Sequence, residues 1–264
     1  MIKIILLTLV CVLSTAPFYI SQAQLVQQVE RYMNDQDFQA LQSFVDKVPV
    51  SRDSSIRAYW YPYRQTTSLG WTGSLIVEES RQDPVKEYLS YVTSYRLDII
   101  TMGNVIVYSR LLHKQYLNDT SNLFSYKTVS TVTHSNGLSK FKASFQQEYG
   151  IKVSLTGLFV DSVYYGDTCL YNDIKTPERK LVEKMVAGKD RKGLYRLLQS
   201  PLTEMQFYGV SGFYTLQKQG QILSEKEMML IRQILQKKGT LKTCGRRQFT
   251  FLKTIEEIAT SFKF

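Results

Sequence analysis

Hydrophobic and polar positions along the chain repeat with two different periods, and the changes of period divide it into three zones. In the first zone, residues 24–50, apolar side chains recur at helical spacing on both sides of the polar run 34–37. Pro49 ends the second apolar pattern because proline cannot continue a helix. These positions predict a pair of short helices.

The second zone, residues 51–172, alternates apolar and polar positions. The alternation is clearest over 87–100, where most odd-numbered positions are apolar or aromatic and most even-numbered ones are polar. A period of two predicts a half-buried strand. Further strands are predicted at 56–63, 73–78, 105–112, 125–133 and 151–155, with a helix over 139–149. The zone therefore reads as an antiparallel, β-rich α+β domain.

The third zone, residues 173–264, returns to helical spacing. Pro177 opens one predicted helix and Gly188 closes it, and Asp190 can cap the next. Ser224 with Glu227 three positions later is the pattern of a capping box. A last helix is predicted over 251–262. Short helices joined by short polar turns pack as antiparallel neighbours, so we expect an all-α C-terminal domain, an array of helical hairpins.

One part of this zone, residues 190–239, has the features of a helical hairpin. A leucine pair ends the first helix, a Ser-Pro turn follows, and two glycines lie three positions apart on the second helix. These residues are Leu197, Leu198, Ser200, Pro201, Gly209 and Gly212. The arrangement resembles a HEAT-type hairpin, in which small residues lie where the helices touch, although the neighbouring segments do not repeat it. The resemblance implies a scaffold or interaction surface and transfers no active site.

The N-terminus has the three parts of an export signal. Lys3 supplies a positive charge, residues 4–13 form an apolar run, and Ser21 and Ala23 provide small side chains at a cleavage site. We expect a signal peptide over 1–23, cleavage after Ala23, and a secreted or periplasmic protein. The run is shorter than the roughly 20 residues that span a bilayer. No integral membrane segment is therefore expected after signal removal, and a retained anchor is the alternative.

Charge and cysteine content refine this picture. The chain has 33 basic and 23 acidic residues, and loss of Lys3 lowers its net charge from +10 to +9. A basic protein is attracted to anionic polymers or membranes, but the basic residues are scattered, which solubility alone explains, and no nucleic acid partner is expected.

Cys11 leaves with the signal, so the mature chain keeps Cys169 and Cys244, 75 positions apart. In an oxidising compartment such a pair predicts a disulfide, which would contribute roughly 3–4 kcal/mol; two buried thiols are the alternative.

Catalytic and metal-binding patterns are scarce. His113 and His134 are the only histidines, and neither has a second ligand at metal spacing. Neither a nucleophile elbow nor a glycine-rich phosphate loop occurs. We therefore nominate no catalytic residue, metal or cofactor. Two carboxylate pairs stay open as candidates for glycoside hydrolysis: Glu78 with Glu79, and Asp161 with Asp167.

Aromatic residues are the most unusual feature of the composition. Exposed tyrosine and tryptophan clusters suit sugar rings, peptides or partner proteins. The candidate ligand-binding residues are Tyr59, Trp60, Tyr61, Tyr63 and Trp71. A tyrosine-rich rim of the core is the alternative.

The sequence thus favours a non-enzymatic secreted or periplasmic binding protein with a protein or glycan partner. A carboxylate-based hydrolase acting on polysaccharide, and a basic protein docking on an anionic polymer or membrane surface, are the alternatives.

Overall fold

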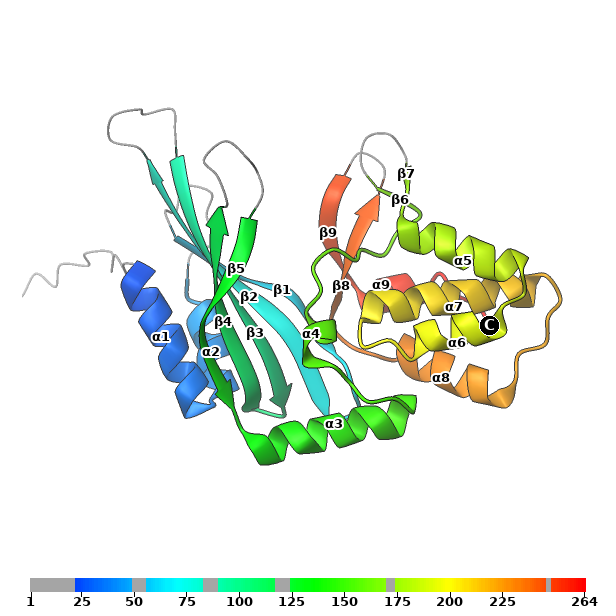
Figure 1. The fold of residues 1–264 in the computed structure, drawn as a ribbon, viewed down its shortest axis with the longest axis horizontal. Coiled ribbons are helices and arrows are strands. Elements are labelled where there is room, and N and C mark those ends of the chain that lie inside the picture. The colour runs from blue at the N-terminus through cyan, green and yellow to red at the C-terminus, as the bar shows by residue number, and fades with distance from the viewer. Residues whose placement is uncertain (1–21, 49–55, 83–89, 117–123, 170–173, 246–247) are drawn as a thin grey trace, which may run out of the picture.

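The computed structural model describes residues 22–48, 56–82, 90–116, 124–169, 174–245 and 248–264 (Figure 1). Within these residues it contains nine helices and a five-stranded antiparallel sheet, which confirms the mixed α+β class. Residues 1–21 of the predicted leader and Pro49 lie outside the described residues. Among the helices described, none has the length and apolar character needed to cross a bilayer.

The large sheet is a meander in which each strand pairs with the next along the chain. Its strands are β1 (Ile56–Gln65), β2 (Gly70–Gln82), β3 (Ser90–Met102), β4 (Val105–Tyr116) and β5 (Phe124–Thr133). Leu75 pairs with Leu97, and Leu97 pairs with Leu111, so a row of leucines crosses the middle of the sheet. All three point to the same face because directly paired residues share a face.

The predicted helix pair is confirmed and covers the leucine face of the sheet. It consists of α1 (Gln22–Asp35) and α2 (Phe38–Val45), and Asp37 caps α2 by accepting a hydrogen bond from the amide of Ala40 at 2.9 Å. The helices and the sheet together bury a hydrophobic cluster of Val29, Met33, Phe38, Leu41, Val45, Ala58, Leu75, Val77, Leu97, Ile99, Ile106 and Leu111.

The opposite face of the sheet packs against α3 (Ser135–Tyr149) and the short α4 (Leu155–Leu158). The strand predicted over 151–155 is wrong. Val153 and Leu155, two positions apart, both pack against the cluster that contains Phe141 and Leu158. Their spacing gives a period of two without strand pairing.

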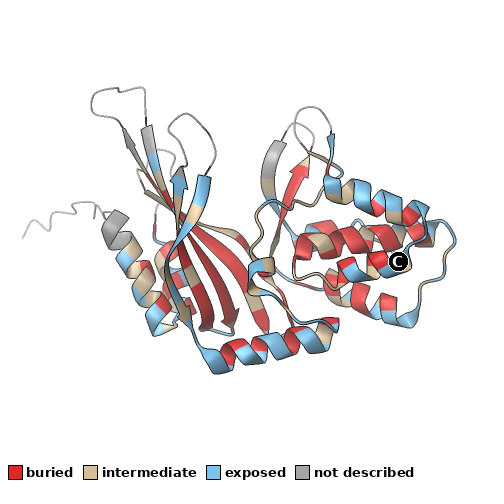
Figure 2. Ribbon diagram, viewed as in Figure 1, coloured by how far each residue is buried: buried red, intermediate tan, exposed pale blue. Residues whose placement is uncertain are grey.

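Helices α5 (Pro177–Ala187), α6 (Arg191–Leu198), α7 (Thr203–Lys218), α8 (Glu225–Leu235) and α9 (Ile255–Ala259) form a second body, here called the helical lobe (Figure 1). Buried residues run along α7, which lies among the other helices (Figure 2). The predicted caps are confirmed. Asp190 accepts from the amide of Gly193 at 2.8 Å, and Ser224 and Glu227 form the capping box of α8.

The predicted hairpin contact is present between α6 and α7. A side chain at Gly209 would meet the backbone nitrogen of Leu198 at 2.9 Å, and one at Gly212 would overlap Leu194. Glycine is therefore required for the close approach of the two helices.

The all-α prediction for residues 173–264 is wrong in part, because strands occur there too. They are β7 (Ile174–Lys175), which pairs with β6 (Thr168–Cys169), and the hairpin of β8 (Thr240–Gly245) and β9 (Gln248–Thr254). Thr254 begins α9 with a capping box to Glu257, so the apolar positions before it belong to a strand and those after it to a helix. The helix predicted over 251–262 is therefore wrong in its first part, although the apolar positions of the whole stretch fit helical spacing.

The hairpin of β8 and β9 joins the helical lobe to the sheet. Arg64 on β1 forms an isolated bridge with Gly239, and the amide of Gln65 donates to the carbonyl of Lys238 at 2.9 Å. The predicted disulfide between Cys169 and Cys244 is present, with Cα atoms 5.2 Å apart.

Candidate functional site

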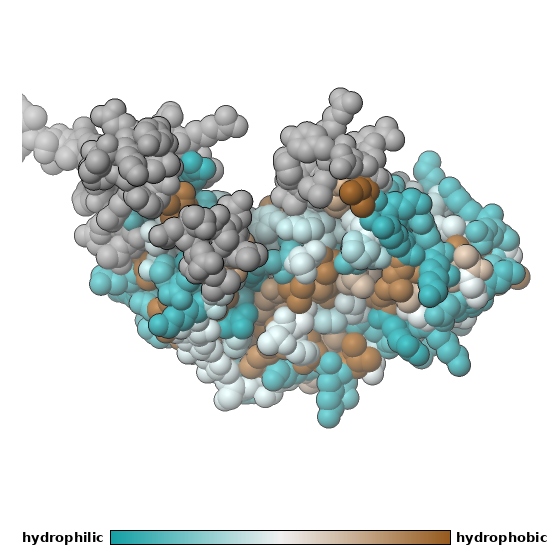
Figure 3. All heavy atoms as spheres, turned by 45° about the horizontal axis from the view of Figure 1, so that its top comes forward, coloured by the Kyte–Doolittle hydropathy of each residue, from teal (hydrophilic) through white to brown (hydrophobic). Residues whose placement is uncertain are grey.

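The candidate site is a groove on the helical lobe. It consists of two hollows of about 590 and 550 Å³, and both are lined by Asp167 and Arg179. The first hollow also touches β8, β9 and α9, and the second runs between α5 and α7. Hydrophobic and hydrophilic side chains alternate on the surface of the helical lobe seen at the right of Figure 3.

Apolar walls flank the charged pair on both sides. In the first hollow these are Tyr165, Phe251 and Ile258, and in the second they are Val182 and Val186. Each hollow has a volume typical of small-ligand sites, which range over about 300–1,000 Å³.

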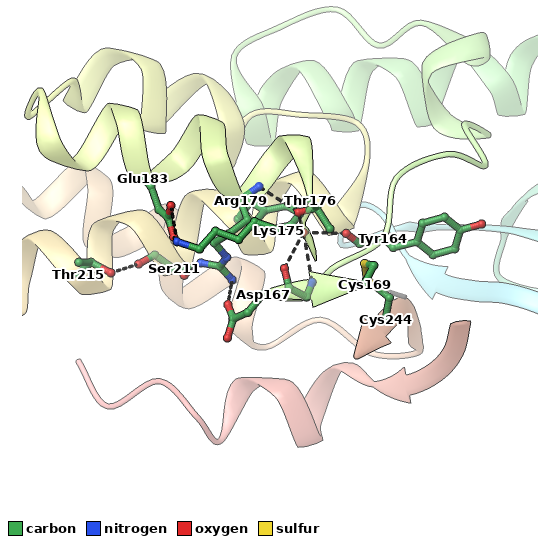
Figure 4. Close-up of polar contacts among 12 residues, drawn as sticks. Tyr164, Asp167, Cys169, Lys175, Thr176, Arg179, Glu183, Ser211, Thr215 and Cys244 are labelled. Carbon is green, nitrogen blue, oxygen red and sulfur yellow. Dashed lines mark hydrogen bonds and ion pairs between the residues drawn. A yellow bond between two sulfur atoms is a disulfide. The ribbon is translucent and has the colours of Figure 1, made fainter. Parts of the chain in front are cut away.

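Arg179 is fixed by the start of α5. Thr176 caps this helix by accepting a hydrogen bond from the amide of Arg179 at 3.0 Å. The guanidinium lies 5.2 Å from the ring centre of Tyr208 and 5.9 Å from that of Tyr165, and its Nη1 donates to the hydroxyl of Ser211 at 2.8 Å (Figure 4). The side chain is only 12% exposed. Cation–π contacts and a fixed hydroxyl therefore hold the guanidinium in one orientation.

The carboxylate that pairs with Arg179 is exposed. Oδ1 of Asp167 lies 2.7 Å from Nη2 of Arg179 in an ion pair, and the Asp167 side chain is 83% exposed. The Nε of Arg179 is buried and makes no hydrogen bond with the described residues. One donor of the guanidinium is thus unused, and another is held by a carboxylate at the surface.

Tyr208 connects the floor of the groove to the segment that carries Asp167. Its buried hydroxyl lies 2.8 Å from Oγ1 of Thr176, and it donates toward the carbonyls of Tyr164 and Gly166 at 2.8 and 2.9 Å. Burial raises the pKa of Tyr208 to about 12, so the hydroxyl keeps its proton as a donor at neutral pH.

The same segment is attached to β8. Tyr165 forms a parallel bridge with Thr243, and the disulfide follows four residues later (Figure 4). A side chain at Gly166 would overlap the backbone of Cys244, so only glycine permits this approach. Asp167 therefore lies on a segment that is fixed at both ends.

The aromatic residues nominated from the sequence do not all share one face. Trp60, Tyr63 and Trp71 form a row beside α2, with ring centres 5.2 Å apart for both neighbouring pairs. A bulge between Trp60 and Tyr63 brings these two to the same side, whereas Tyr59 points to the opposite face. All five, Tyr61 included, are partly buried. A ligand-binding role of this set stays a prediction.

The carboxylates nominated for hydrolysis make separate contacts. Glu78 and Glu79 are neighbours on β2 and point to opposite faces of the sheet. Asp161 pairs with Arg96, and Asp167 pairs with Arg179. The hydrolase alternative is a prediction that these contacts leave open.

The two histidines lie in different settings, one in a ring contact and one at the start of a helix. His113 stacks on Tyr95 with ring centres 4.7 Å apart, and His134 precedes α3. In the part of the chain that the structure describes, no three His, Cys, Asp or Glu residues gather as metal ligands do.

Sequence reasoning missed Arg179 as a site residue. Its side chain meets Tyr165 and Asp167, which precede β6, and residues of α7 some forty positions further along the chain, so no local motif marks it. The signals within the sequence were the proline-opened helix that carries Arg179 and the tyrosines near Cys169.

Comparison with known proteins adds no family to this geometry. No protein-family model matches the chain, and neither a curated protein nor a solved structure matches it. The structure by itself describes an α+β protein with a disulfide beside an arginine-centred groove.

Proposed function

We propose that this protein is a secreted or periplasmic, non-enzymatic binding protein that holds a carboxylate of a protein partner at Arg179. The observation that carries the proposal is the state of this guanidinium. It is oriented by two tyrosine rings, and its acidic partner Asp167 is 83% exposed.

The guanidinium fork suits a carboxylate because two parallel N–H groups meet its two oxygens. Asp167 is the exposed member of this ion pair, so a ligand carboxylate competes for Nη2 with a carboxylate that is largely solvated. Asp167 then acts as an internal competitor that occupies the site in the absence of the partner.

The walls of the groove favour a peptide as the bearer of that carboxylate. Tyr165 and Phe251 in the first hollow are half-buried, so each ring offers part of its surface to side chains that flank the carboxylate. An extended segment would thus gain orientation from Arg179 and area from the walls.

The extracytoplasmic part of the proposal is supported by two features. A disulfide is typical of oxidising compartments, and the first 23 residues have the pattern of a cleaved leader. Sequencing the N-terminus of the mature protein tests this, and Gln24 is the expected first residue.

The binding site is tested with the mature protein and fluorescent pools of random hexapeptides, measured by fluorescence polarisation. One pool ends in a free carboxylate and the other in an amide. We expect the acid pool to bind tighter. Arg179→Lys should weaken its binding about tenfold because a charged hydrogen bond and the fork are lost. Arg196→Lys, an exposed arginine on α6, is the matched control and should change little.

Asp167→Asn provides a second and more specific test of the site. Removing the internal competitor should strengthen binding of the acid pool about two- to fivefold, whereas damage to the fold would weaken it. Asp35→Asn, which removes the exposed carboxylate paired with Arg31, is its control and should have no effect. Equal binding of both pools, or a loss of affinity in Asp167→Asn, would contradict the proposal.

A further inference from the structure

The end of the helical lobe farthest from the large sheet combines basic and exposed apolar residues. The turn between α5 and α6 and the loop between α7 and α8 meet there (Figure 1). A hollow of about 420 Å³ lies at this end, and its cationic lining residues are Arg191, Lys192, Arg196 and Lys226. We call this region the distal end.

Most of the charge at the distal end is unpaired. Arg191 forms an ion pair with Glu227, whose side chain is 9% exposed and also completes the capping box of α8. Lys192, Arg196 and Lys226 make no ion pair with the described residues, and the ammonium of Lys226 lies 5.4 Å from the ring centre of Tyr195. The hollow therefore presents a net positive charge.

Two protruding hydrophobic side chains border this charge. Ile222 is 89% exposed and Met229 is 64% exposed, the highest values among the large hydrophobic residues that the structure describes. Arg191 donates from Nη1 to the carbonyl of Ile222 at 3.0 Å, which fixes the loop beside the hollow. Met229 follows Lys226 by three positions on α8 and so lies on the same side of that helix.

We propose that the distal end docks on an anionic lipid surface, with the three unpaired cations at the phosphates and Ile222 and Met229 in the interfacial layer. Each basic residue near an anionic surface gains free energy from the surface potential. Exposed apolar side chains gain free energy by leaving water, and the interfacial layer of a lipid membrane offers them an apolar phase.

This combination favours a membrane over a polysaccharide, which would satisfy the cations but leave both apolar side chains in water. The docking surface is independent of the groove at Arg179. Docking through the distal end would place the proposed binding protein at the membrane surface.

The test is co-sedimentation of the mature protein with vesicles at 100 mM salt. Vesicles of phosphatidylglycerol mixed with phosphatidylcholine should bind the protein, and vesicles of phosphatidylcholine alone should bind it much more weakly. Lys192→Glu/Lys226→Glu should lower binding at least tenfold. Lys140→Glu/Lys142→Glu, which changes the net charge equally on the exposed side of α3, should lower it less than threefold.

Ile222→Ser/Met229→Ser distinguishes a membrane from a soluble polyanion. We expect it to weaken vesicle binding about fivefold or more and to leave heparin binding unchanged. Equal losses in the two charge variants, no binding to the anionic vesicles, or vesicle binding insensitive to the serine variant would each overturn the proposal. Arg179→Lys should bind vesicles like the natural protein, which separates this outcome from failure of the groove.

Discussion

Lys237 is a buried lysine whose protonation should control the stability of the junction between the sheet and the helical lobe. The residue is 5% exposed, and its Nζ donates to Oε1 of Gln206 at 2.7 Å while lying 5.0 Å from the ring centre of Tyr149. Burial lowers the pKa of Lys237 from 10.5 to about 7, and the positive charge of Arg64 adds to this effect. Glu148 and Glu204 act in the opposite direction.

The sign and size of the effect follow from proton linkage. Between pH 7 and 10.5 the unfolded chain carries the lysine proton and the folded protein does not, so the free energy of unfolding rises with pH in this window. From pH 6.5 to 9.5 the rise from Lys237 is about 3 kcal/mol. Lys242, whose pKa burial lowers to about 8, adds about 2 kcal/mol in the same direction.

Lys237→Met isolates the first contribution. The assay is urea unfolding followed by tryptophan fluorescence at pH 6.5 and 9.5, with the disulfide intact. We expect the stability gained between these pH values to fall by about 3 kcal/mol in the variant. The unpaired Oε1 of Gln206 costs about the same at both pH values and cancels in the difference.

The neighbouring Lys238 provides the control, because its side chain is 61% exposed and pairs with Glu256 at the surface. In Lys238→Met the free energy of unfolding should rise between pH 6.5 and 9.5 as much as in the natural protein. The reasoning fails if Lys237→Met shows the same rise as the natural protein, because Lys237 would then have the same pKa in the folded and unfolded states. The upper pH stays below 10 because buried tyrosines such as Tyr63, with a pKa raised by burial to about 12, oppose the trend when unfolded tyrosines ionise.

Three further predictions concern the helical lobe, each measured by urea unfolding at pH 7. Replacing Cys169 and Cys244 by serine should lower the free energy of unfolding by roughly 3–4 kcal/mol, because a link across 75 positions restricts the unfolded chain; an unchanged midpoint would count against this. Gly209→Ala should cost about 1–3 kcal/mol through overlap with α6, whereas Gly188→Ala, with ordinary contacts only, should cost less than about 1 kcal/mol. Tyr208→Phe should cost about 2 kcal/mol, because the hydroxyl satisfies several buried groups, and a smaller loss than in Tyr214→Phe at the surface would refute that account.

The local features of this protein were readable from its sequence. Alternation predicted five strands of the large sheet, because side chains on a strand point alternately to its two faces. The capping residues Asp190 and Ser224 were identified for a similar reason, since a cap involves groups three positions apart. Pairing of Cys169 with Cys244 followed from counting, because only these two cysteines lie outside the predicted leader.

Short segments with two competing periods were misread. Residues 251–262 have apolar positions that fit a helix, yet β9 and α9 divide them at Thr254. β8 provides a partner for the first half, and hydrogen bonding to a neighbouring strand overrides local spacing. Residues 151–155 form no strand, because Val153 and Leu155 pack against the cluster of Phe141 and Leu158 instead of pairing with another strand.

What the sequence determined by itself is therefore most of the local elements, two of the helix caps and the pairing of the two cysteines, since each depends on residues a few positions apart or on a count. Only the tertiary structure decided which residues form the groove. Asp167, Arg179 and the α7 residues Tyr208 and Ser211 come from three separate segments, and the bulge in β1 brings Trp60 and Tyr63 to one face. A site of this kind depends on distances in space, and these arise from packing of the whole chain.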